Sequence, residues 1–254
     1  MRISIIQPDL KWEDRYYNLQ HLSEMMHPLS GETDLVILPE MFTTGFTMNR
    51  SISEEPEGKT FIWMQETSQK AKFALCGSYP VTENGRYYNR FVFIIPEGKS
   101  WYYDKRHLFS YGKENNYYEK GQSRVTFTYN DFRIIPFICY DLRFPVWSRN
   151  IDDYDLAIYV SSWPQSRISV WNTLLAARAI ENQCFVAGSN RIGTDGNNII
   201  HNGMSMIINP KGEIITSASD KETVISANLS LEELREFRRK FNVLRDRDDF
   251  SIIP

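Results

Sequence analysis

Three residues capable of nucleophilic or acid–base chemistry stand where apolar, strand-like runs of the sequence end. Glu40 closes "DLVILPE", Lys105 closes "WYYDK" and Cys139 closes "IIPFIC". The end of a strand is rigid, yet its last side chain can leave the core, and active sites of α/β proteins gather there. A carboxylate can take the proton of a thiol, and an ammonium group can stabilise the negative charge that forms. The three residue types together therefore suit hydrolysis by a thiol.

Cys139 differs from the other two cysteines of the chain. Cys76 and Cys184 lie inside apolar runs, which is typical of buried structural thiols, so a thiol reagent should favour Cys139. The sequence turns polar after Cys139, and "YDLRFP" is typical of a strand-to-helix elbow that exposes a nucleophile and directs backbone N–H groups at an oxyanion. Within this elbow, Arg143 is expected to form a bracing ion pair with Asp141.

His107 is a competing candidate for the base. Alternate side chains of a strand point the same way, so Lys105 and His107 would share one face if the strand continued. The residues alone therefore leave a pair of Cys139 with His107 open beside a pair with Glu40. The histidines are scattered, no Cys or His spacing resembles a zinc site, and no glycine-rich phosphate loop occurs. We expect chemistry without a metal or a cofactor.

Helical and strand-like segments alternate along the chain, so we expect layered α/β packing with a mixed sheet. "ENGR" and Asn130-Asp131 are turn signals that predict hairpins. Helices are expected over residues 16–26, 60–72, 170–182 and 231–241, and apolar residues recur at helical spacing in the first of these segments. Buried strands are expected over residues 33–40 and 154–162, and an irregular tail over residues 242–254.

Composition restricts the class of protein. The 254 residues, 42% of them hydrophobic, can form a sizeable core, and no repeat or linker divides them, so one domain over residues 1–254 is predicted. A formal net charge of -3 without basic runs argues against a nucleic-acid partner. No apolar run approaches the ~20 residues of a membrane span, and the start does not resemble a signal peptide. Three cysteines, which cannot all pair, favour a reducing, cytoplasmic location.

The sequence resembles the nitrilase, or carbon–nitrogen hydrolase, superfamily. The segments "LVILPEMF", "YYDKRHLF" and "ICYDLRFP" match its Glu–Lys–Cys triad, and "RISIIQPDL", "SSWP", "AARAIENQCFVAGSNRIG" and "SMIINPKGEII" extend the match over nearly the whole chain. The segments "DKRHLFSYGKENNYYEKG" and "SSWPQSR" are most similar to bacterial amidases of the ω-amidase type. The resemblance implies a four-layer αββα sandwich with two mixed sheets, commonly paired into homodimers or larger assemblies.

The resemblance also implies a reaction. Water would cleave the terminal amide of a small ω-monoamide of a dicarboxylic acid, such as 2-oxoglutaramate, to the diacid and ammonia. Cys139 would be the nucleophile that forms a thioester, and Glu40 would be the general base. Lys105 and the backbone N–H of Tyr140 would stabilise the oxyanion. Glu114, in "YGKENNYY", matches a second glutamate of the family and would orient Lys105 or the substrate amide.

Aromatic residues beside these positions can line a substrate pocket or simply pack in the core. They are Phe42, Phe109, Tyr118 and Trp163. Arg167, just beyond "SSWPQS", is a candidate for binding the free carboxylate, because a guanidinium group binds carboxylates through two parallel hydrogen bonds. Arg143 is another candidate, although its closeness to Cys139 and Asp141 favours the ion pair within the elbow. The resemblance reduces His107 to a supporting loop residue. The alternatives are a nitrilase or carbamoylase, or a non-catalytic binding protein, although the complete triad argues against the latter.

Overall fold

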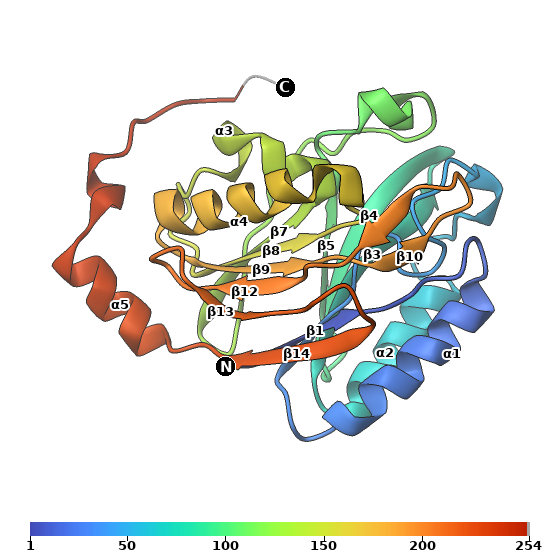
Figure 1. Cartoon of the computed structure of the whole chain (residues 1–254), viewed down its shortest axis with the longest axis horizontal. Helices are drawn as coiled ribbons and strands as arrows, with labels where there is room; N and C mark the ends of the chain where they lie inside the picture. Colours follow the sequence, from blue (N-terminus) through green and yellow to red (C-terminus); the bar gives the residue numbers. More distant parts are fainter. Residues whose placement is uncertain (253–254) are drawn as a thin grey trace.

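Two six-stranded sheets lie face to face between outer helical layers (Figure 1). The computed structural model describes residues 1–252. The first sheet has the order β14 (Thr223–Asn228), β1 (Arg2–Gln7), β2 (Leu35–Ile37), β3 (Ala74–Glu83), β4 (Arg86–Ile94), β5 (Ser100–Asp104). The second has the order β13 (Ile214–Ser217), β12 (Met206–Ile208), β9 (Phe185–Ser189), β8 (Leu156–Val160), β7 (Phe132–Ile138), β6 (Phe127–Tyr129).

The helices cover the outer faces of the sheets. In Figure 1, α1 and α2 lie beneath the first sheet, while α3 and α4 lie over the second. The α-helices are α1 (Arg15–Met26), α2 (Lys59–Ala71), α3 (Pro145–Ser148), α4 (Ile168–Asn182) and α5 (Leu231–Lys240). Short 3-10 helices are η1 (His27–Leu29), η2 (Arg50–Ile52), η3 (Ser110–Gly112), η4 (Glu114–Asn116), η5 (Cys139–Arg143), η6 (Gln165–Arg167) and η7 (Val243–Asp246). The predicted αββα sandwich is confirmed.

Both sheets are mixed and repeat one arrangement. Three parallel strands lie at the centre of each, β1, β2 and β3 in the first and β7, β8 and β9 in the second. Antiparallel strands flank each parallel group. Because parallel strands place their carboxyl ends at one edge of a sheet, side chains that follow these strands can meet there.

Alternating side chains build two hydrophobic layers. Leu35 and Ile37 of β2 point into the layer between the two sheets. Val36 points the opposite way and packs with Leu22 of α1 and Met64 of α2. A strand buried on both faces has no polar alternation, which explains why its sequence is a continuous apolar run.

The sequence located most elements, with errors at their ends. The predicted helices correspond to α1, α2, α4 and α5. The turn at Asn130-Asp131 joins β6 to β7 with both residues at positive φ (+46° and +64°). The strand expected over residues 33–40 is regular only over Leu35–Ile37. The small β10 (Ile192–Thr194) and β11 (Ile200–Asn202) hairpin was not predicted. The tail contains η7, and residues 253–254 lie outside the described part.

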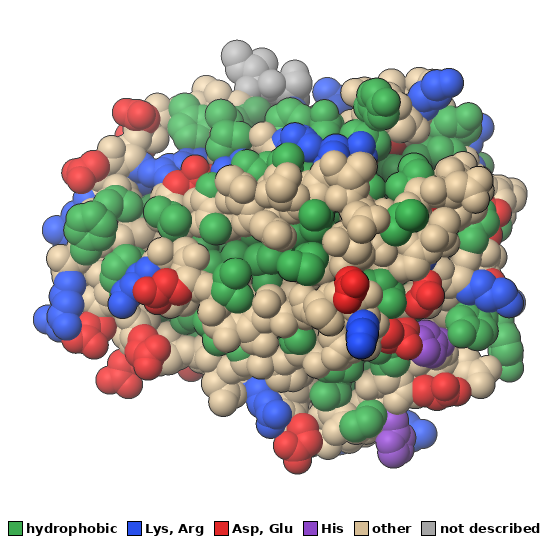
Figure 2. Space-filling model, in the orientation of Figure 1, with side chains coloured by type: hydrophobic (Ala, Val, Ile, Leu, Met, Phe, Trp, Pro, Cys, Tyr) green, Lys and Arg blue, Asp and Glu red, His purple; other side chains and the backbone are tan. Residues whose placement is uncertain are grey.

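Acidic and basic side chains are mixed over the face of the molecule that Figure 2 shows, and neither sign forms a continuous area on it. The even distribution agrees with the small net charge of -3. Within residues 1–252, every helix is too short or too polar to cross a lipid bilayer.

Candidate active site

Cys139 stands on a sharp turn at the end of β7. The strand ends at Ile138, and Cys139 opens η5 with a φ of +46°. A left-handed backbone costs a residue with a side chain about 1–2 kcal/mol, so neighbouring contacts must hold it. The predicted elbow is therefore present, with a 3-10 helix in place of an α-helix.

Asp141 supplies those contacts. The Asp141 Oδ2 atom accepts hydrogen bonds from the Ile138 N–H (3.0 Å) and the Tyr103 hydroxyl (2.7 Å). The Oδ1 atom accepts from the backbone N–H of His107 (2.9 Å) and lies 2.8 Å from His107 Nδ1. The His107 ring also stacks on Phe144, with 3.8 Å between ring centroids. Asp141 thus joins the elbow to the segment after β5, and it pairs with His107 where the sequence predicted Arg143.

Glu40 lies in a turn beyond β2 and is fully buried. Its Oε1 atom accepts from Lys105 Nζ (2.8 Å) and from Asn89 Nδ2 (2.8 Å). Its Oε2 atom accepts from the backbone N–H of Ser162 (2.9 Å), which follows β8 in the opposite sheet. The ends of β2 and β8 therefore meet across the interface between the two sheets, and the carboxylate of Glu40 lies between them.

Lys105 and Glu114 form a second buried pair behind Glu40. Lys105 Nζ lies 2.9 Å from Glu114 Oε2 and 3.1 Å from Glu114 Oε1, and both residues are fully buried. Burial alone would lower the pKa of Lys105, but Glu114 and Glu40 more than offset this effect and raise it. Burial raises the pKa of Glu114, which Lys105 partly counteracts. Lys105 therefore stays an ammonium group at neutral pH.

The loop that carries Lys105 and Glu114 returns to its starting point. The N–H of Gly121 donates to the carbonyl of Lys105 (2.8 Å), where the loop leaves β5. A Cβ atom at position 121 would lie 2.0 Å from the carbonyl oxygen of Asp104, so this closure requires glycine. At the middle of the loop, the N–H of Phe109 donates to Glu114 Oε2 (2.6 Å) and directs this carboxylate inward.

The thiol of Cys139 is in its neutral form at rest. Burial raises its pKa, the charge of Glu40 raises it further, and Lys105 lowers it. A neutral thiol beside a buried carboxylate can pass its proton directly to that carboxylate when sulfur attacks, and an ammonium group behind the carboxylate stabilises the extra negative charge.

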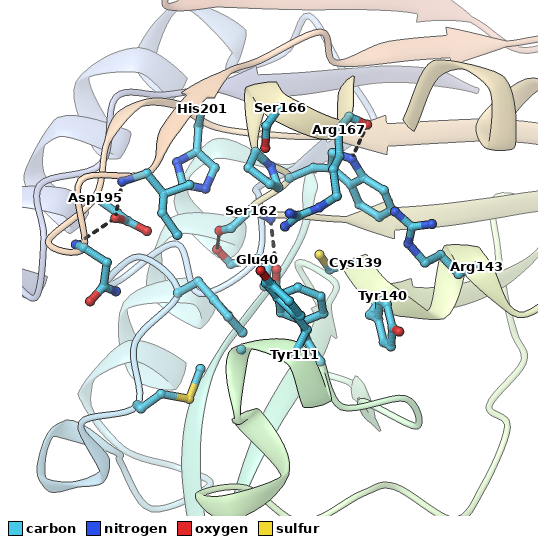
Figure 3. Close-up of a pocket in the computed structure, with 18 residues that line it drawn as sticks. Glu40, Tyr111, Cys139, Tyr140, Arg143, Ser162, Ser166, Arg167, Asp195 and His201 are labelled. Atoms are coloured by element: carbon cyan, nitrogen blue, oxygen red, sulfur yellow. Dashed lines mark hydrogen bonds between the residues drawn. The ribbon is translucent and has the colours of Figure 1, made fainter. Parts of the chain in front are cut away.

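A pocket of about 490 Å³ opens over Cys139, and Glu40 forms part of its wall (Figure 3). Its volume lies in the range of small-molecule sites. Tyr140 and Arg143 lie to one side of the sulfur in Figure 3, while Asp195 and His201 lie to the other. The other lining residues are Phe46, Met48, Phe109, Tyr111, Gly112, Ser162, Trp163, Pro164, Ser166, Arg167, Asn197 and Ile199.

Of the aromatic residues proposed for the pocket, Phe109 and Trp163 line it, and Phe42 and Tyr118 do not. Phe42 is fully buried among the side chains between the first sheet and its helices, 6.0 Å from Tyr79 between ring centroids. Tyr118 is buried, and its hydroxyl donates to the carbonyl of Thr47 (2.9 Å). Core packing, the alternative that the sequence left open, accounts for both.

Two arginines line the pocket without an acidic partner among residues 1–252. The guanidinium carbon of Arg167 lies 5.3 Å from the ring centroid of Phe109, and that of Arg143 lies 5.2 Å from that of Trp163. Neither guanidinium is within 4.0 Å of a described carboxylate, since every ion pair of this part of the chain involves other residues. Both are free to bind an anion.

Asn89, Ser162 and His201 are site residues that the sequence reasoning missed. Ser162 lies in "SSWP", a motif that could have indicated it. Burial and the nearby Arg191 lower the pKa of His201 to about 4, so its ring is neutral at physiological pH. Nothing near Asn89 in the sequence distinguishes it, because its partners come from distant segments.

Metal ligands are not grouped in the described chain. Among residues 1–252, the His, Cys, Asp and Glu side chains form no cluster of three or more that could hold a metal ion. The expectation of chemistry without a cofactor stays a prediction.

Comparison with known proteins identifies the class. The family of carbon–nitrogen hydrolases matches residues 2–239. The chain is similar to the omega-amidase YafV of Escherichia coli strain K12, with 44% identity over 99% of this chain and 98% of that protein. It is also 31% identical to the 2-oxoglutaramate amidase of Bacillus subtilis strain 168, over 96% of each.

A solved structure shares the fold over the whole described chain. It is XC1258 of Xanthomonas campestris, a CN-hydrolase superfamily protein with an arsenic adduct in its active site, at a TM-score of 0.97 and 38% identity, covering 99% of this chain and 98% of that one. The protein therefore belongs to the carbon–nitrogen hydrolase family, within the nitrilase superfamily. It is a hydrolase that acts on carbon–nitrogen bonds.

Proposed function

We propose that the protein hydrolyses the terminal amide of small ω-monoamides of dicarboxylic acids, with 2-oxoglutaramate as the type of substrate, through a thioester on Cys139. One observation carries the proposal: the pocket wall presents Cys139 beside Glu40, with Lys105 directly behind the carboxylate. The names of the relatives, an omega-amidase and a 2-oxoglutaramate amidase, support the substrate class.

In the first step, the sulfur of Cys139 attacks the amide carbon and a C–S bond forms. The thiol proton passes to Glu40, and the electron pair of the carbonyl π bond moves to oxygen. Lys105 stabilises this oxyanion through its charge, because its contacts at rest go to the two glutamates. The backbone N–H of Tyr140, near the start of η5, lacks an intrahelical acceptor and is the second donor. Such a donor contributes about 3–4 kcal/mol.

In the second step, the C–N bond breaks and Glu40 returns its proton to the departing nitrogen. Ammonia leaves, and Cys139 carries the acyl group as a thioester. Water then attacks the thioester carbon and gives its proton to Glu40, after which the C–S bond breaks and sulfur recovers that proton. One carboxylate alternates between base and acid, as an amide needs because its nitrogen leaves only when protonated. Glu114 keeps Lys105 oriented throughout.

The free carboxylate of the substrate would bind Arg167, with Arg143 as a second cation on the same pocket. Both guanidinium groups lie against aromatic rings and lack acidic partners among the described residues. An unpaired guanidinium favours a carboxylate through paired charge-assisted hydrogen bonds. The proposal therefore predicts that amides with a distal carboxylate react faster than amides without one.

An ammonia-release assay tests the proposal. The panel contains 2-oxoglutaramate, 2-oxosuccinamate, succinamate, glutamine, asparagine, simple nitriles and a carbamoyl amino acid. We expect the highest kcat/KM for 2-oxoglutaramate, 2-oxosuccinamate and succinamate. Cys139→Ala should lower kcat/KM by at least about 10³-fold while its circular-dichroism spectrum stays unchanged. Preferential turnover of nitriles or carbamoyl compounds would assign one of those activities instead, and no turnover of the panel would favour a non-catalytic relative.

We further propose a homodimer in the cytoplasm. The family resemblance and exposed apolar side chains of the α3 and α4 layer support the pairing, among them Val146 (57% exposed) and Ile180 (54%). The small number of cysteines, none of them paired among residues 1–252, supports the location. Sedimentation velocity of the purified protein measures the first property directly.

A further inference from the structure

Asn89 contacts all three charged residues of the buried cluster behind the pocket. It is fully buried in β4, and its Nδ2 atom donates to Glu40 Oε1 (2.8 Å) and to Glu114 Oε1 (3.3 Å). Its backbone carbonyl accepts from the N–H of Lys105 (3.0 Å). One residue thus holds the two carboxylates with its side chain and the start of the lysine loop with its backbone.

The orientation of the Asn89 amide follows from its neighbours. Carboxylates only accept hydrogen bonds, so the amino group of the amide must face them. Its Oδ1 atom then has no hydrogen-bond partner among residues 1–252. An unpartnered buried carbonyl is unfavourable for folding, so the benefit of this asparagine lies in the amino group between the two carboxylates.

These contacts distinguish the two oxygens of Glu40. The Oε1 atom accepts from both Asn89 and Lys105, while within residues 1–252 the Oε2 atom accepts a hydrogen bond from the N–H of Ser162 alone. Oε1 is therefore engaged on both sides, and Oε2 keeps a lone pair for a proton. We infer that Asn89 is a positioning residue for Cys139: it holds Glu40 so that Oε2 receives and returns the thiol proton. This inference deepens the proposed function and rests on it.

The neutrality of Asn89 is as important as its position. Glu40 and Glu114 face one ammonium group, Lys105, so the cluster already has more acidic than basic groups. An aspartate at position 89 would add a third carboxylate and would remove both N–H donors. An alanine would remove the donors without adding charge. The two substitutions therefore separate the loss of hydrogen bonds from the addition of charge.

The test compares Asn89→Ala and Asn89→Asp with Asn150→Ala in the full-length protein. Asn150 is a matched control, because it is fully buried, does not line the pocket, and its Nδ2 atom donates to the carbonyls of Tyr154 and Asn182 (both 3.0 Å). Measurements are kcat, KM and the pH profile of kcat/KM on 2-oxoglutaramate. A further measurement needs no substrate: the rate at which iodoacetamide alkylates Cys139 is measured at several pH values by mass spectrometry of the peptide that contains this residue.

For Asn89→Ala we expect kcat to fall about tenfold to hundredfold, which corresponds to the loss of a hydrogen bond to a charged group. KM should change less than about threefold, because Asn89 is not on the pocket wall. The acid limb of kcat/KM should move up by about one pH unit, since the ionised base loses a donor that stabilises it. Asn89→Asp should lose more activity than Asn89→Ala.

Asn150→Ala should lower the thermal midpoint while leaving kcat and the acid limb unchanged. If Asn89→Ala gives that same pattern, Asn89 is a structural residue and the inference is overturned. The alkylation profile keeps the two proposals apart. A shift of its acid limb in Asn89→Ala supports the inference even if the wild type releases no ammonia from the panel, and an unmoved limb refutes it even if the wild type is an active amidase.

Discussion

Two fully buried carboxylates, Glu40 and Asp141, differ in how completely hydrogen-bond donors occupy their oxygen atoms. Each oxygen of Asp141 has two donors around it, from Ile138, Tyr103 and His107. Glu40 has two donors on Oε1 and one on Oε2. Glu40 also forms part of the pocket wall, and Asp141 does not.

The difference is consistent with a structural role for Asp141 and with the reactive role that we propose for Glu40. A carboxylate whose lone pairs all accept hydrogen bonds has no free site for a proton. Asp141 therefore fixes the elbow and the lysine loop to each other, while Glu40 keeps one oxygen available beside the sulfur. The residue type is acidic in both cases, and the surrounding donors decide what each residue does.

Glu40→Gln is the substitution with the largest expected effect on activity. The amide keeps the shape of the side chain but cannot take the thiol proton, so we expect kcat for ammonia release to fall about 10³-fold. The thermal midpoint should change much less than it does on loss of Asp141. A normal acyl-enzyme burst in stopped-flow measurements of this variant would assign the base to another group, with His107 next.

Asp141→Ala should have the largest effect on stability. It leaves the donors of Tyr103, Ile138 and His107 buried without an acceptor, so we expect the free energy of unfolding to fall by about 3 kcal/mol. Urea unfolding measures the loss. Asp141→Asn keeps two acceptor lone pairs and should lose less. A stability equal to that of the wild type would show that the elbow holds without this carboxylate.

His201 extends the comparison to a polar group of the pocket whose buried Nδ1 atom has no partner among residues 1–252. The pKa of His201 falls from 6.5 to about 4 on folding. The unfolded chain therefore binds a proton between these values that the folded chain does not, so stability is lost as the pH falls through this window. Between pH 7 and pH 5.5 the loss from this group is about 1 kcal/mol.

Urea unfolding at pH 7 and pH 5.5 measures this loss. The matched variant is His201→Gln, which cannot gain a proton in this range, so its stability should change less between the two pH values than that of the wild type. Equal changes in both proteins would remove His201 as the source.

His107→Asn should have the smallest effect on turnover. The asparagine Nδ2 atom can replace His107 Nδ1 as a donor to Asp141, so kcat should stay within about threefold of the wild type. Steady-state ammonia release measures it. A fall in kcat as large as that of Glu40→Gln would reverse the roles assigned to Glu40 and to the pair of His107 with Asp141.

The sequence was a good guide to residues whose chemistry is local. Cys139 could be distinguished from Cys76 and Cys184 because a polar turn follows it, and the structure leaves Cys139 partly exposed and buries the other two. The sequence could not decide whether Phe42 lines the pocket or packs in the core, because an apolar residue beside a motif gives the same sequence pattern in both cases.

Arg143 shows a second kind of failure. Its closeness in sequence to Asp141 suggested an ion pair, but the turn of η5 sends the two side chains in different directions, toward Trp163 and His107 respectively. Neighbours along a tight turn point to different sides, so nearness in sequence does not imply contact.

What the sequence determined by itself was the set of reactive residue types, their order, the strands that end at them and the family to which the chain belongs. Only the tertiary structure decided which groups meet. Glu40 receives its hydrogen bonds from residues 49, 65 and 122 positions away, namely Asn89, Lys105 and Ser162. The physical reason is that local sequence governs backbone conformation, whereas the protonation and reactivity of a buried group depend on whichever donors and charges the packed sheets bring to it.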